Sequence, residues 1–482
     1  MSLGALEATV VGTAMPTVVA TLGGLAHYSW VFSAYLLTST ATVPIWGRLS
    51  DLYGRRRMYL AGVAIFLVGS AASGAAQSMP QLIAARLLQG VGAGAIIPLS
   101  LTIVGELYSL AERARTQALF SGVWGVASIA GPLVGGYITD AISWRWVFYI
   151  NLPFGLLALA VIALAYPTAR GVRNVRVDWL GGSLLFSGVS ALLMALGGEG
   201  GPFWPWLFAS VVLLTAFVWA ERRTAEPILP IDLLQMPVIA RPLAVVFLVG
   251  IALFGALAFI PLFVQAVMGG SATQAGQAVT PLFLGWVIMS VVGAGTTVRL
   301  GYRVVAVSGS VLMTTGFIGL SLLTAESSRT ALFASCFILG AGMGMQMLSL
   351  LLAVQHGVER SRLGIATSLN QFSRSIGAAV GVAGMGAVLA RGLEGVAVPR
   401  GVDGAAAASA IALSGALRLQ FAAALHQVFV VGTVVSGAGL IGTLFLPHVD
   451  FTRGVRSSAG EELLAAEMAN LEPDDEPMVV PE

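Results

Sequence analysis

Long apolar stretches separated by short polar breaks cover almost the whole chain. Most are near the roughly 20 residues that a helix needs to cross the hydrocarbon core of a bilayer. They are continuously apolar, which excludes the alternating strands of a membrane β-barrel and leaves helices. The pattern predicts fourteen membrane-spanning helices, over residues 2–22, 28–47, 57–77, 81–105, 115–139, 145–166, 178–198, 204–220, 241–268, 273–297, 303–324, 330–355, 363–390 and 426–447.

The placement of the basic residues predicts how these helices are oriented. All 25 are arginine, and 18 of them fall in alternate breaks or in the C-terminal tail. Five lie on the opposite side, and only Arg86 and Arg374 fall inside spans. Because cytoplasmic loops carry an excess of basic residues, we expect both termini in the cytoplasm. An error in one span would reverse the pattern after it, so the arginines support the count of fourteen.

Composition and charge exclude other classes of protein. Hydrophobic residues make up 57% of the chain and charged residues 10%, which excludes both a soluble globular protein and a disordered one. The single cysteine, Cys336, excludes an internal disulfide framework and a cysteine-based zinc site. The net charge of +2 conceals an acidic tail, because residues 457–482 hold eight acids and no arginine.

The first span differs from the others at its start. Glu7 lies only six residues after Met1. At 1.5 Å per residue, the segment before it reaches only about 9 Å. We therefore expect either a short first helix or a natural start upstream.

Three motifs recur at nearly one spacing. The segment 47–56 is echoed by 295–303 at an offset of 248 residues, the Gly90-x-Gly92-x-Gly94 run by Gly340-x-Gly342-x-Gly344 at 250, and Arg113-Ala-Arg115 by Arg360-Ser-Arg362 at 247. Two six-helix halves around a midplane cavity are a common design of secondary transporters. We predict an N-terminal half over residues 1–166, two inserted linker helices within 167–240, a C-terminal half over 241–447 and an acidic cytoplasmic tail over 448–482.

The break between the second and third spans carries Gly47, Asp51, Gly54, Arg55 and Arg56. Glycine suits a tight turn, and an acid near a helix end can pair with arginine or cap a neighbouring helix. We interpret this loop as a conformational latch that holds the halves together on the cytoplasmic face and releases when they rock. An ordinary positive-inside loop is the alternative.

This loop resembles the signature loop of the major facilitator superfamily. Four other segments resemble motifs of that superfamily or of its fourteen-span drug:proton antiporters: Arg86 with Leu88-Gln89-Gly90, Gly131-Pro132-Leu-Val-Gly135-Gly136, Leu6-Glu7-Ala-Thr9 onward to Pro16, and 144–153. The resemblance covers about residues 3–447. It implies the major facilitator fold and proton-driven export of amphipathic, often cationic compounds from a bacterial cytoplasmic (inner) membrane protein, with antibiotic resistance as the outcome. Glu7 departs from the family, which usually has aspartate there.

Glu7 is the one acid that the predicted spans leave at membrane depth. An ionisable group there costs at least a few kcal/mol, and so indicates function. We interpret Glu7 as the proton-accepting carboxylate, for which the proton and the drug compete. The alternative is that a shortened first helix leaves Glu7 solvated at its edge.

Arg86 is the expected partner of Glu7, and the resemblance implies a role in proton coupling. Alternatively, Arg86 is structural and bonds backbone carbonyls.

Other polar and aromatic residues are candidates for the substrate cavity: Thr9, Tyr35, Gln89, Trp124, Asn370, Gln371 and Arg374. Asn370 and Arg374 share a helix face, where they line the cavity or act as hydrogen-bonding contacts between helices. The aromatic rings stack on cationic ligands, or else anchor helices at the membrane interface. In the antiporter motif, Gly131 and Pro132 should bend or locally open the fifth span, and Gly135 and Gly136 allow a neighbouring helix to approach closely.

The leading interpretation is a proton-coupled multidrug exporter that works by alternating access. Its partners would be small-molecule substrates, protons and the lipid bilayer, with no nucleic acid, and we expect a monomer. We expect no cofactor, since the proton gradient supplies the energy. The alternative is a dedicated exporter of one endogenous metabolite or lipid. A membrane-embedded enzyme is disfavoured because the spans show no embedded metal site and no nucleophile with a base.

Overall fold

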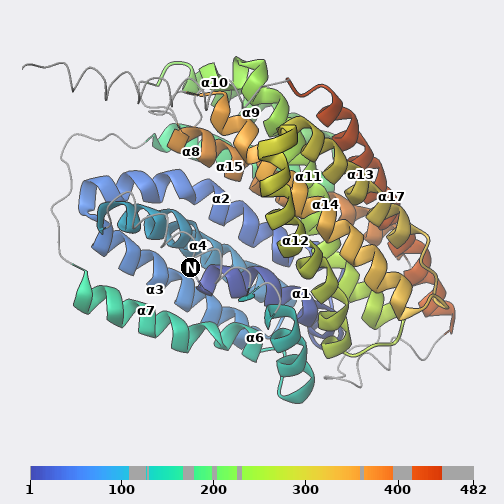
Figure 1. The fold of residues 1–482 in the computed structure, drawn as a ribbon. Coiled ribbons are helices and arrows are strands. Elements are labelled where there is room, and N and C mark those ends of the chain that lie inside the picture. The colour runs from blue at the N-terminus through green and yellow to red at the C-terminus, as the bar shows by residue number, and fades with distance from the viewer. Residues whose placement is uncertain are drawn as a thin grey trace, which may run out of the picture.

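The computed structural model describes residues 2–107, 126–127, 130–166, 178–197, 203–224, 231–358, 363–394 and 415–447. These residues form helices and no strand, which confirms the all-α prediction (Figure 1). Residues 130–141 are also helical. The elements are α1 (Ser2–Leu22), η1 (Leu25–His27), α2 (Tyr28–Tyr53), α3 (Arg55–Ala75), α4 (Met79–Leu107), α6 (Trp146–Tyr149), α7 (Asn151–Ala165), α8 (Trp179–Gly197), α9 (Phe203–Glu221), α10 (Ile231–Gln235), α11 (Pro237–Leu262), η2 (Phe263–Val267), α12 (Ala272–Leu300), α13 (Tyr302–Ser321), α14 (Arg329–His356), α15 (Leu363–Gly392) and α17 (Gly415–Leu444).

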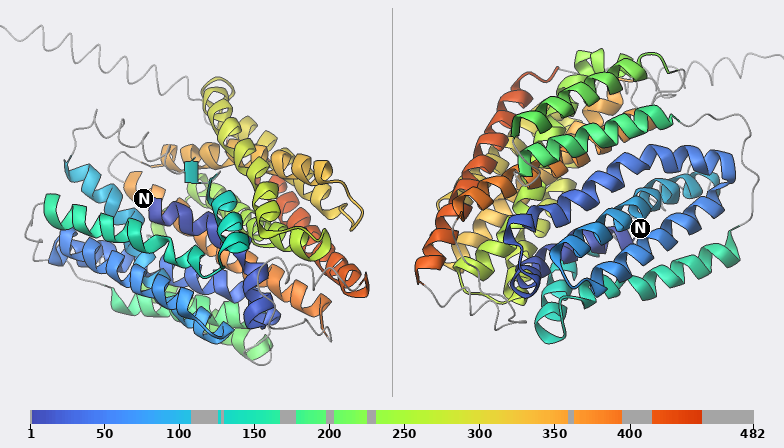
Figure 2. Two further views of the ribbon diagram at one scale, coloured as in Figure 1. Left: turned by 90° about the horizontal axis from the view of Figure 1, so that it is seen from below. Right: turned by 180° about the vertical axis from the view of Figure 1, so that it is seen from behind.

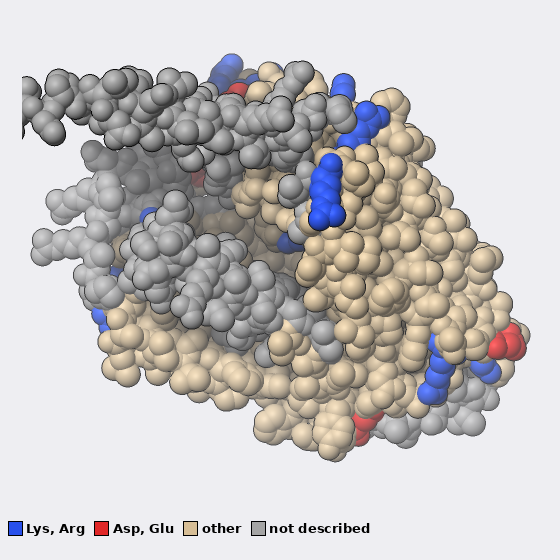
Figure 3. Space-filling model, in the orientation of Figure 1, with Lys and Arg blue, Asp and Glu red and all other residues tan. Residues whose placement is uncertain are grey.

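The described helices are those of a multi-pass membrane protein. Eleven segments within them are long and apolar enough to cross a bilayer, and Val10–Leu22 forms a shorter apolar helix. The second expected span is the long but less apolar α2. Most of the fifth, 115–139, lies outside the described residues. The count of fourteen therefore stays a prediction. Figure 3 shows a broad uncharged belt between arginines at the top and charged side chains at the lower right, as lipid contact requires.

Successive helices run in opposite directions, so the turns gather at two ends of the molecule. The turn at Gly24 leads from α1 to α2, and the turn at Gly54 leads from α2 to α3. We call these ends the Gly24 end and the Gly54 end. Helices α1–α7 form an N-terminal group and α11–α17 a C-terminal group, which lie beside one another in Figures 1 and 2.

The internal repeat reappears as repeated backbone geometry. Gly54 joins α2 to α3 with φ 91° and ψ 141°, and Gly301 joins α12 to α13 with φ 80° and ψ 158°. Residues with side chains rarely adopt such positive φ values, so glycine is required at both turns. The two glycines lie in the loops that the sequence pairs as echoes.

The glycine runs of α4 and α14 pack in the same alternating way. A Cβ atom at Gly90 would strike α2, and one at Gly92 would strike α3. In the second half, a Cβ atom at Gly340 would strike α12, and one at Gly342 would strike α13. Each run thus lets one helix lie backbone to backbone against two neighbours, as small residues do between membrane helices.

The two groups contact one another on the Gly24 side of the molecule. Tyr28 donates to the Ala258 carbonyl at 2.5 Å, and Gln265 donates from its Nε2 to the Thr13 carbonyl at 2.9 Å. Every hydrogen bond that joins the two groups within the described ranges lies on this side. Gln265 belongs to η2, a π-helix that continues α11, a form often found at functional positions.

The inserted helices pack against both groups. Leu185, Val189 and Leu193 of α8 are buried in one apolar cluster with Leu37 of α2 and Leu369 of α15. Figure 2 (right) shows the green α8 running along the blue α2. Because α8 contacts both groups, it links their motions.

The last helix begins earlier than the sequence pattern predicts. α17 starts at Gly415 and continues to Leu444, whereas the expected span was 426–447. Arg418 explains the difference, since its Nε donates to the Val267 carbonyl and its Nη2 to the Ala325 carbonyl, both at 2.5 Å. The first part of α17, before the expected span, is therefore packed helix.

Asp140 joins the two groups by capping a helix of the opposite group. Its Oδ1 accepts from the Ala272 backbone N–H at 3.1 Å, and its Oδ2 accepts from the Thr273 N–H at 2.8 Å and hydroxyl at 2.6 Å. A carboxylate at a helix N-terminus satisfies unpaired N–H groups and complements the helix dipole. The sequence placed Asp140 only at a span end.

We expect Asp140→Ala to destabilise the closed Gly24 end. The N–H groups of Ala272 and Thr273 lose a charged acceptor, which typically costs about 1 kcal/mol. Thermal unfolding of the purified protein should show a lowered melting temperature. Glu326→Gln is the matched control, because Glu326 lies in the turn after α13 and its backbone N–H donates to the Thr324 hydroxyl of the same turn. An unchanged melting temperature for Asp140→Ala would show that the contact contributes nothing.

Candidate functional site

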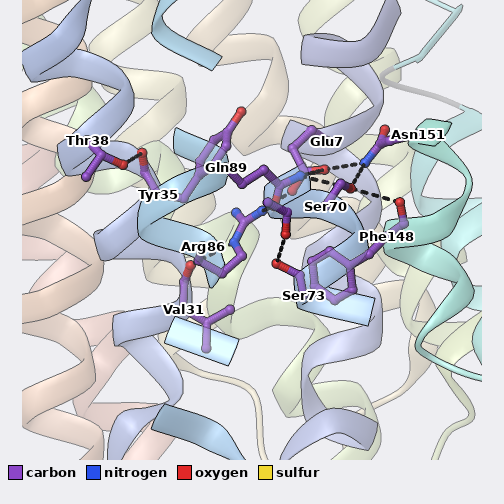
Figure 4. Close-up of polar contacts among 11 residues, drawn as sticks. Glu7, Val31, Tyr35, Thr38, Ser70, Ser73, Arg86, Gln89, Phe148 and Asn151 are labelled. Carbon is purple, nitrogen blue, oxygen red and sulfur yellow. Dashed lines mark hydrogen bonds and ion pairs between the residues drawn. The ribbon is translucent and has the colours of Figure 1, made fainter. Parts of the chain in front are cut away.

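A buried ion pair lies within the N-terminal group. Glu7 of α1 is 3% exposed and Arg86 of α4 is 2% exposed, and Arg86 Nη1 donates to Glu7 Oε1 (Figure 4). Both charged groups of this ion pair are buried. Glu7 is therefore not solvated at the edge of a short helix, and Arg86 bonds an acid as well as the backbone. A buried charge persists only when it is paired and hydrogen-bonded.

Two amides complete the hydrogen bonds of the Glu7 carboxylate. Asn151, the first residue of α7, donates from Nδ2 to Glu7 Oε2 at 2.7 Å. Gln89 of α4 donates from Nε2 to the same oxygen at 3.0 Å, and its Oε1 accepts from Arg86 at 2.7 Å. Ser70 of α3 accepts from both amides and donates to the Phe148 carbonyl at 2.9 Å. Four helices therefore supply the surroundings of one carboxylate.

Arg86 is held from its other side as well. Its Nε donates to the Val31 carbonyl at 3.1 Å, and its guanidinium carbon lies 4.1 Å from the centre of the Tyr35 ring. Tyr35, expected as a stacking surface for a cationic ligand, thus stacks on the protein's own cation in this arrangement. Arg86 is positioned by α2 as well as by Glu7, so the ion pair couples α1, α2 and α4.

This arrangement suits a carboxylate that gains and loses a proton. As an anion, Glu7 accepts from Arg86, Gln89 and Asn151. A protonated Glu7 carries no charge to balance Arg86, and its new O–H group needs an acceptor. The Asn151 Oδ1 atom is buried and has no hydrogen-bond partner in the described part of the chain. An amide oxygen of this kind can accept a hydrogen bond once the amide turns.

The expected polar patch of the C-terminal group lies on α15. Arg374 Nη2 donates to Gln371 Oε1, and Arg374 Nη1 lies 3.7 Å from the Met347 sulfur of α14. Asn370 is buried, and its Nδ2 has no partner among the described residues. These three side chains form a cluster of donors that is separate from the Glu7 network.

The antiporter motif lies where the groups cross. A Cβ atom at Gly136 would strike Ala272 and Thr273 of α12, and one at Gly135 would lie 2.8 Å from the Val10 carbonyl of α1. The carbonyl of Pro132 faces Gly276 of α12, where a Cβ atom would overlap it. Gly131 is buried, and residues 130–141 continue as helix through both it and Pro132.

The latch loop contacts its own helix group. Gly54 makes the turn, Arg55 donates to the Ser50 hydroxyl at 2.5 Å, and Arg56 donates to the Ala163 carbonyl of α7. A Cβ atom at Gly47 would meet open space. The side chains of Asp51 and Thr9, and the whole of Trp124, lie outside the described residues.

Sequence reasoning missed Asn151 and Ser70 as parts of the Glu7 site. Asn151 is 1% exposed and Ser70 is fully buried. Sorting only ionisable residues by depth overlooked neutral amides, although a buried amide also needs hydrogen-bond partners. For Asn151, the free-energy cost of burying an amide without hydrogen-bond partners was a usable signal. For Ser70 there was none, because serine is common in membrane helices.

The family model of the Major Facilitator Superfamily matches residues 1–382. The chain belongs to the major facilitator superfamily. It is 38% identical to "Multidrug transporter protein MdtP" of Bacillus subtilis over 396 residues, which covers 81% of this chain and 73% of the relative. It is 32% identical to "Efflux pump FUS6" of Gibberella moniliformis over 397 residues, which covers 79% of this chain and 70% of that protein.

Solved structures show the same fold. A bacterial homolog of the human lysosomal transporter Spinster, in an inward-facing and unoccupied conformation, superposes with a TM-score of 0.68 at 16% identity. The match covers 92% of this chain and 94% of that one. The major facilitator fold predicted from the sequence motifs is therefore confirmed, and the chain is a membrane transporter of that superfamily.

Proposed function

We propose that this transporter is a proton-coupled antiporter of the fourteen-span drug family, which exports amphipathic or cationic drugs by alternating access. One observation carries the proposal: Glu7 is a carboxylate buried among the helices, held by Arg86, Gln89 and Asn151. Intramembrane acids are costly and commonly serve in proton relays. The names of the relatives, a multidrug transporter and an efflux pump, support the cargo class.

The proposed orientation places the Gly54 end in the cytoplasm of a bacterial inner-membrane protein, with both termini on that side. The arginines at the Gly54 end, among them Arg55, Arg222 and Arg303, support it. The halves are proposed to be residues 1–166 and 241–447, joined by linker helices in 167–240 and followed by the tail 448–482. The protein works as a monomer in the bilayer, without cofactor or nucleic acid.

In this orientation the described arrangement opens toward the cytoplasm, because the two groups contact one another on the opposite side. As substrate enters between the groups, Glu7 loses its proton to the cytoplasm and pairs with Arg86, as in the described arrangement. After the groups rock, a proton from outside neutralises Glu7, releases its hold on Arg86 and favours substrate release. Glu7 lies on α1, which also contacts Gln265 through Thr13, so a change at the carboxylate reaches the contact between the groups.

Drug-induced proton release tests this function. Adding tetraphenylphosphonium, an amphipathic cation, to purified protein in weak buffer should release protons from the wild type and not from Glu7→Gln. Glu326→Gln removes an exposed acid of the turn after α13 and should behave as the wild type. Glu7→Asp keeps the acid and should restore release, which separates loss of the proton site from misfolding. Undiminished release from a folded Glu7→Gln protein would reject Glu7 as the proton acceptor.

Resistance profiling of expressing cells distinguishes the cargo. A multidrug exporter should raise resistance to several unrelated amphipathic compounds, and Glu7→Gln should abolish each increase. A dedicated exporter would be favoured if the cells gained resistance to none of these compounds and the purified protein released protons only when one metabolite or lipid was added.

A further inference from the structure

Two arginines from different helices meet at the Gly54 end of α17. Arg241 of α11 donates from Nη1 to the Phe445 carbonyl at 3.1 Å, and Arg303 of α13 donates from Nη2 to the Leu444 carbonyl at 2.5 Å. Because these carbonyls belong to consecutive residues, both guanidinium groups lie at the same end of α17. Both bonds are solvent-exposed. Within the described ranges, neither guanidinium contacts a carboxylate.

A groove runs from Arg241 along α11 and α17. Its volume is about 230 Å³, and its lining consists of Arg241, Ala244, Val245, Leu248, Gly442 and Phe445. All of these except Arg241 are apolar. A Cβ atom at Gly442 would stand 2.9 Å from Val245 Cγ2, so glycine keeps the floor of the groove low. The groove is thus cationic at one end and apolar along its length.

The groove faces the bilayer and not the interior. Phe445 is 66% exposed and the neighbouring Ile441 is 59% exposed. Figure 1 shows α17 at the outer edge of the helix bundle. Apolar side chains exposed on a membrane-spanning helix contact lipid. The arginines lie where the helices end, which is the depth of the phospholipid headgroups.

We propose that this groove binds one anionic phospholipid. Its phosphate lies between Arg241 and Arg303, and an acyl chain lies in the groove over Gly442. Each guanidinium has five N–H donors, and the structure uses only one of the five in either arginine for a backbone carbonyl. The remaining donors suit phosphate oxygens, and basic pockets between membrane helices commonly hold anionic headgroups. The site is independent of Glu7 and of proton coupling.

Lipid retention by the purified full chain tests this site. After delipidation in detergent, native mass spectrometry should show phosphatidylglycerol retained in preference to phosphatidylcholine. Arg241→Gln and Arg303→Gln should each weaken this retention about fivefold, the contribution of one basic residue at an anionic membrane surface. Gly442→Leu should weaken it with both arginines intact, because its side chain fills the groove. Ala244→Phe fills the groove from the opposite wall and guards against misfolding of Gly442→Leu.

A matched control and three outcomes decide the proposal. Arg222→Gln removes an exposed arginine just after α9, far from the groove in sequence, and should leave retention unchanged. Equal retention of the two lipids would overturn the proposal, because it shows only the general lipid layer. The proposal would also be overturned, in favour of a small-anion site, if inorganic phosphate displaced phosphatidylglycerol while Gly442→Leu and Ala244→Phe retained the lipid as the wild type does. An equal loss in Arg222→Gln would show an unspecific charge effect and also overturn it.

Discussion

Arg86→Met is expected to lower the melting temperature of the purified protein sharply and to abolish transport. At a pH high enough to keep Glu7 ionised, its negative charge would stand in a site where it is 3% exposed, with no cation beside it. Removing one partner of a buried ion pair typically costs about 3–5 kcal/mol, because the remaining charge stays desolvated and uncompensated. Thermal unfolding in detergent and drug export by cells measure the two effects.

The double variant separates stability from function. Glu7→Gln/Arg86→Met removes both charges, so most of the lost stability should return. Transport should not return, because no group is left to carry the proton. An Arg86→Met protein as stable as the wild type at a pH that keeps Glu7 ionised would contradict the structure, since it would mean that Glu7 is solvated. A double variant that still exports drug would contradict the proposed mechanism.

Gly276→Val is expected to hold the Gly24 end open and to stop transport. The Pro132 carbonyl lies where the new Cβ atom would stand, and because this oxygen belongs to a helix backbone, one of the two helices would have to move. Overpacking at such a site typically costs about 1–3 kcal/mol. This cost destabilises the arrangement in which the two groups are in contact at the Gly24 end. An arrangement with the Gly24 end open is not destabilised, because Gly276 and Pro132 are then apart. The equilibrium between the closed and the open arrangement should therefore shift toward the open one.

Distances between spin labels test this prediction. Labels at Ile142→Cys and Glu326→Cys report on the N-terminal and C-terminal groups at the Gly24 end, in a Cys336→Ala background. Gly276→Val should increase the distance between them. Gly384→Ala, in the C-terminal group, is the control because a Cβ atom there has no neighbour within 4 Å. An unchanged distance in Gly276→Val, with wild-type transport, would show that this crossing does not close the Gly24 end.

Much of the fold could be predicted because its signals are local. Bilayer thickness sets the length of each apolar stretch, and eleven stretches of that kind are helices among the described residues. The turns at Gly54 and Gly301 were visible as one repeated motif because both need a positive φ. The start of α17 was not predictable, since Arg418 stabilises it through carbonyls of two distant segments.

The candidate site was predictable only in part. Glu7 and Arg86 stood out because an ionisable residue inside an apolar span carries a large desolvation cost wherever its neighbours lie. Asn151 is 144 positions from Glu7, and nothing in the spacing relates them. Asp140 likewise looked like an ordinary span-end acid, although it caps α12 of the opposite group.

The sequence by itself determined which segments are helical, that the chain repeats, and which carboxylate is buried at membrane depth. These features follow from the free-energy cost of exposing backbone polar groups and charges to lipid. Each segment has this cost whatever its neighbours are, so it can be recognised from the sequence of that segment. Only the tertiary structure decided that Gln89, Asn151 and Ser70 complete the Glu7 site, and that glycines of the antiporter motif meet α12. Hydrogen bonds and close contacts act over about 3 Å, so they depend on how the helices pack against one another.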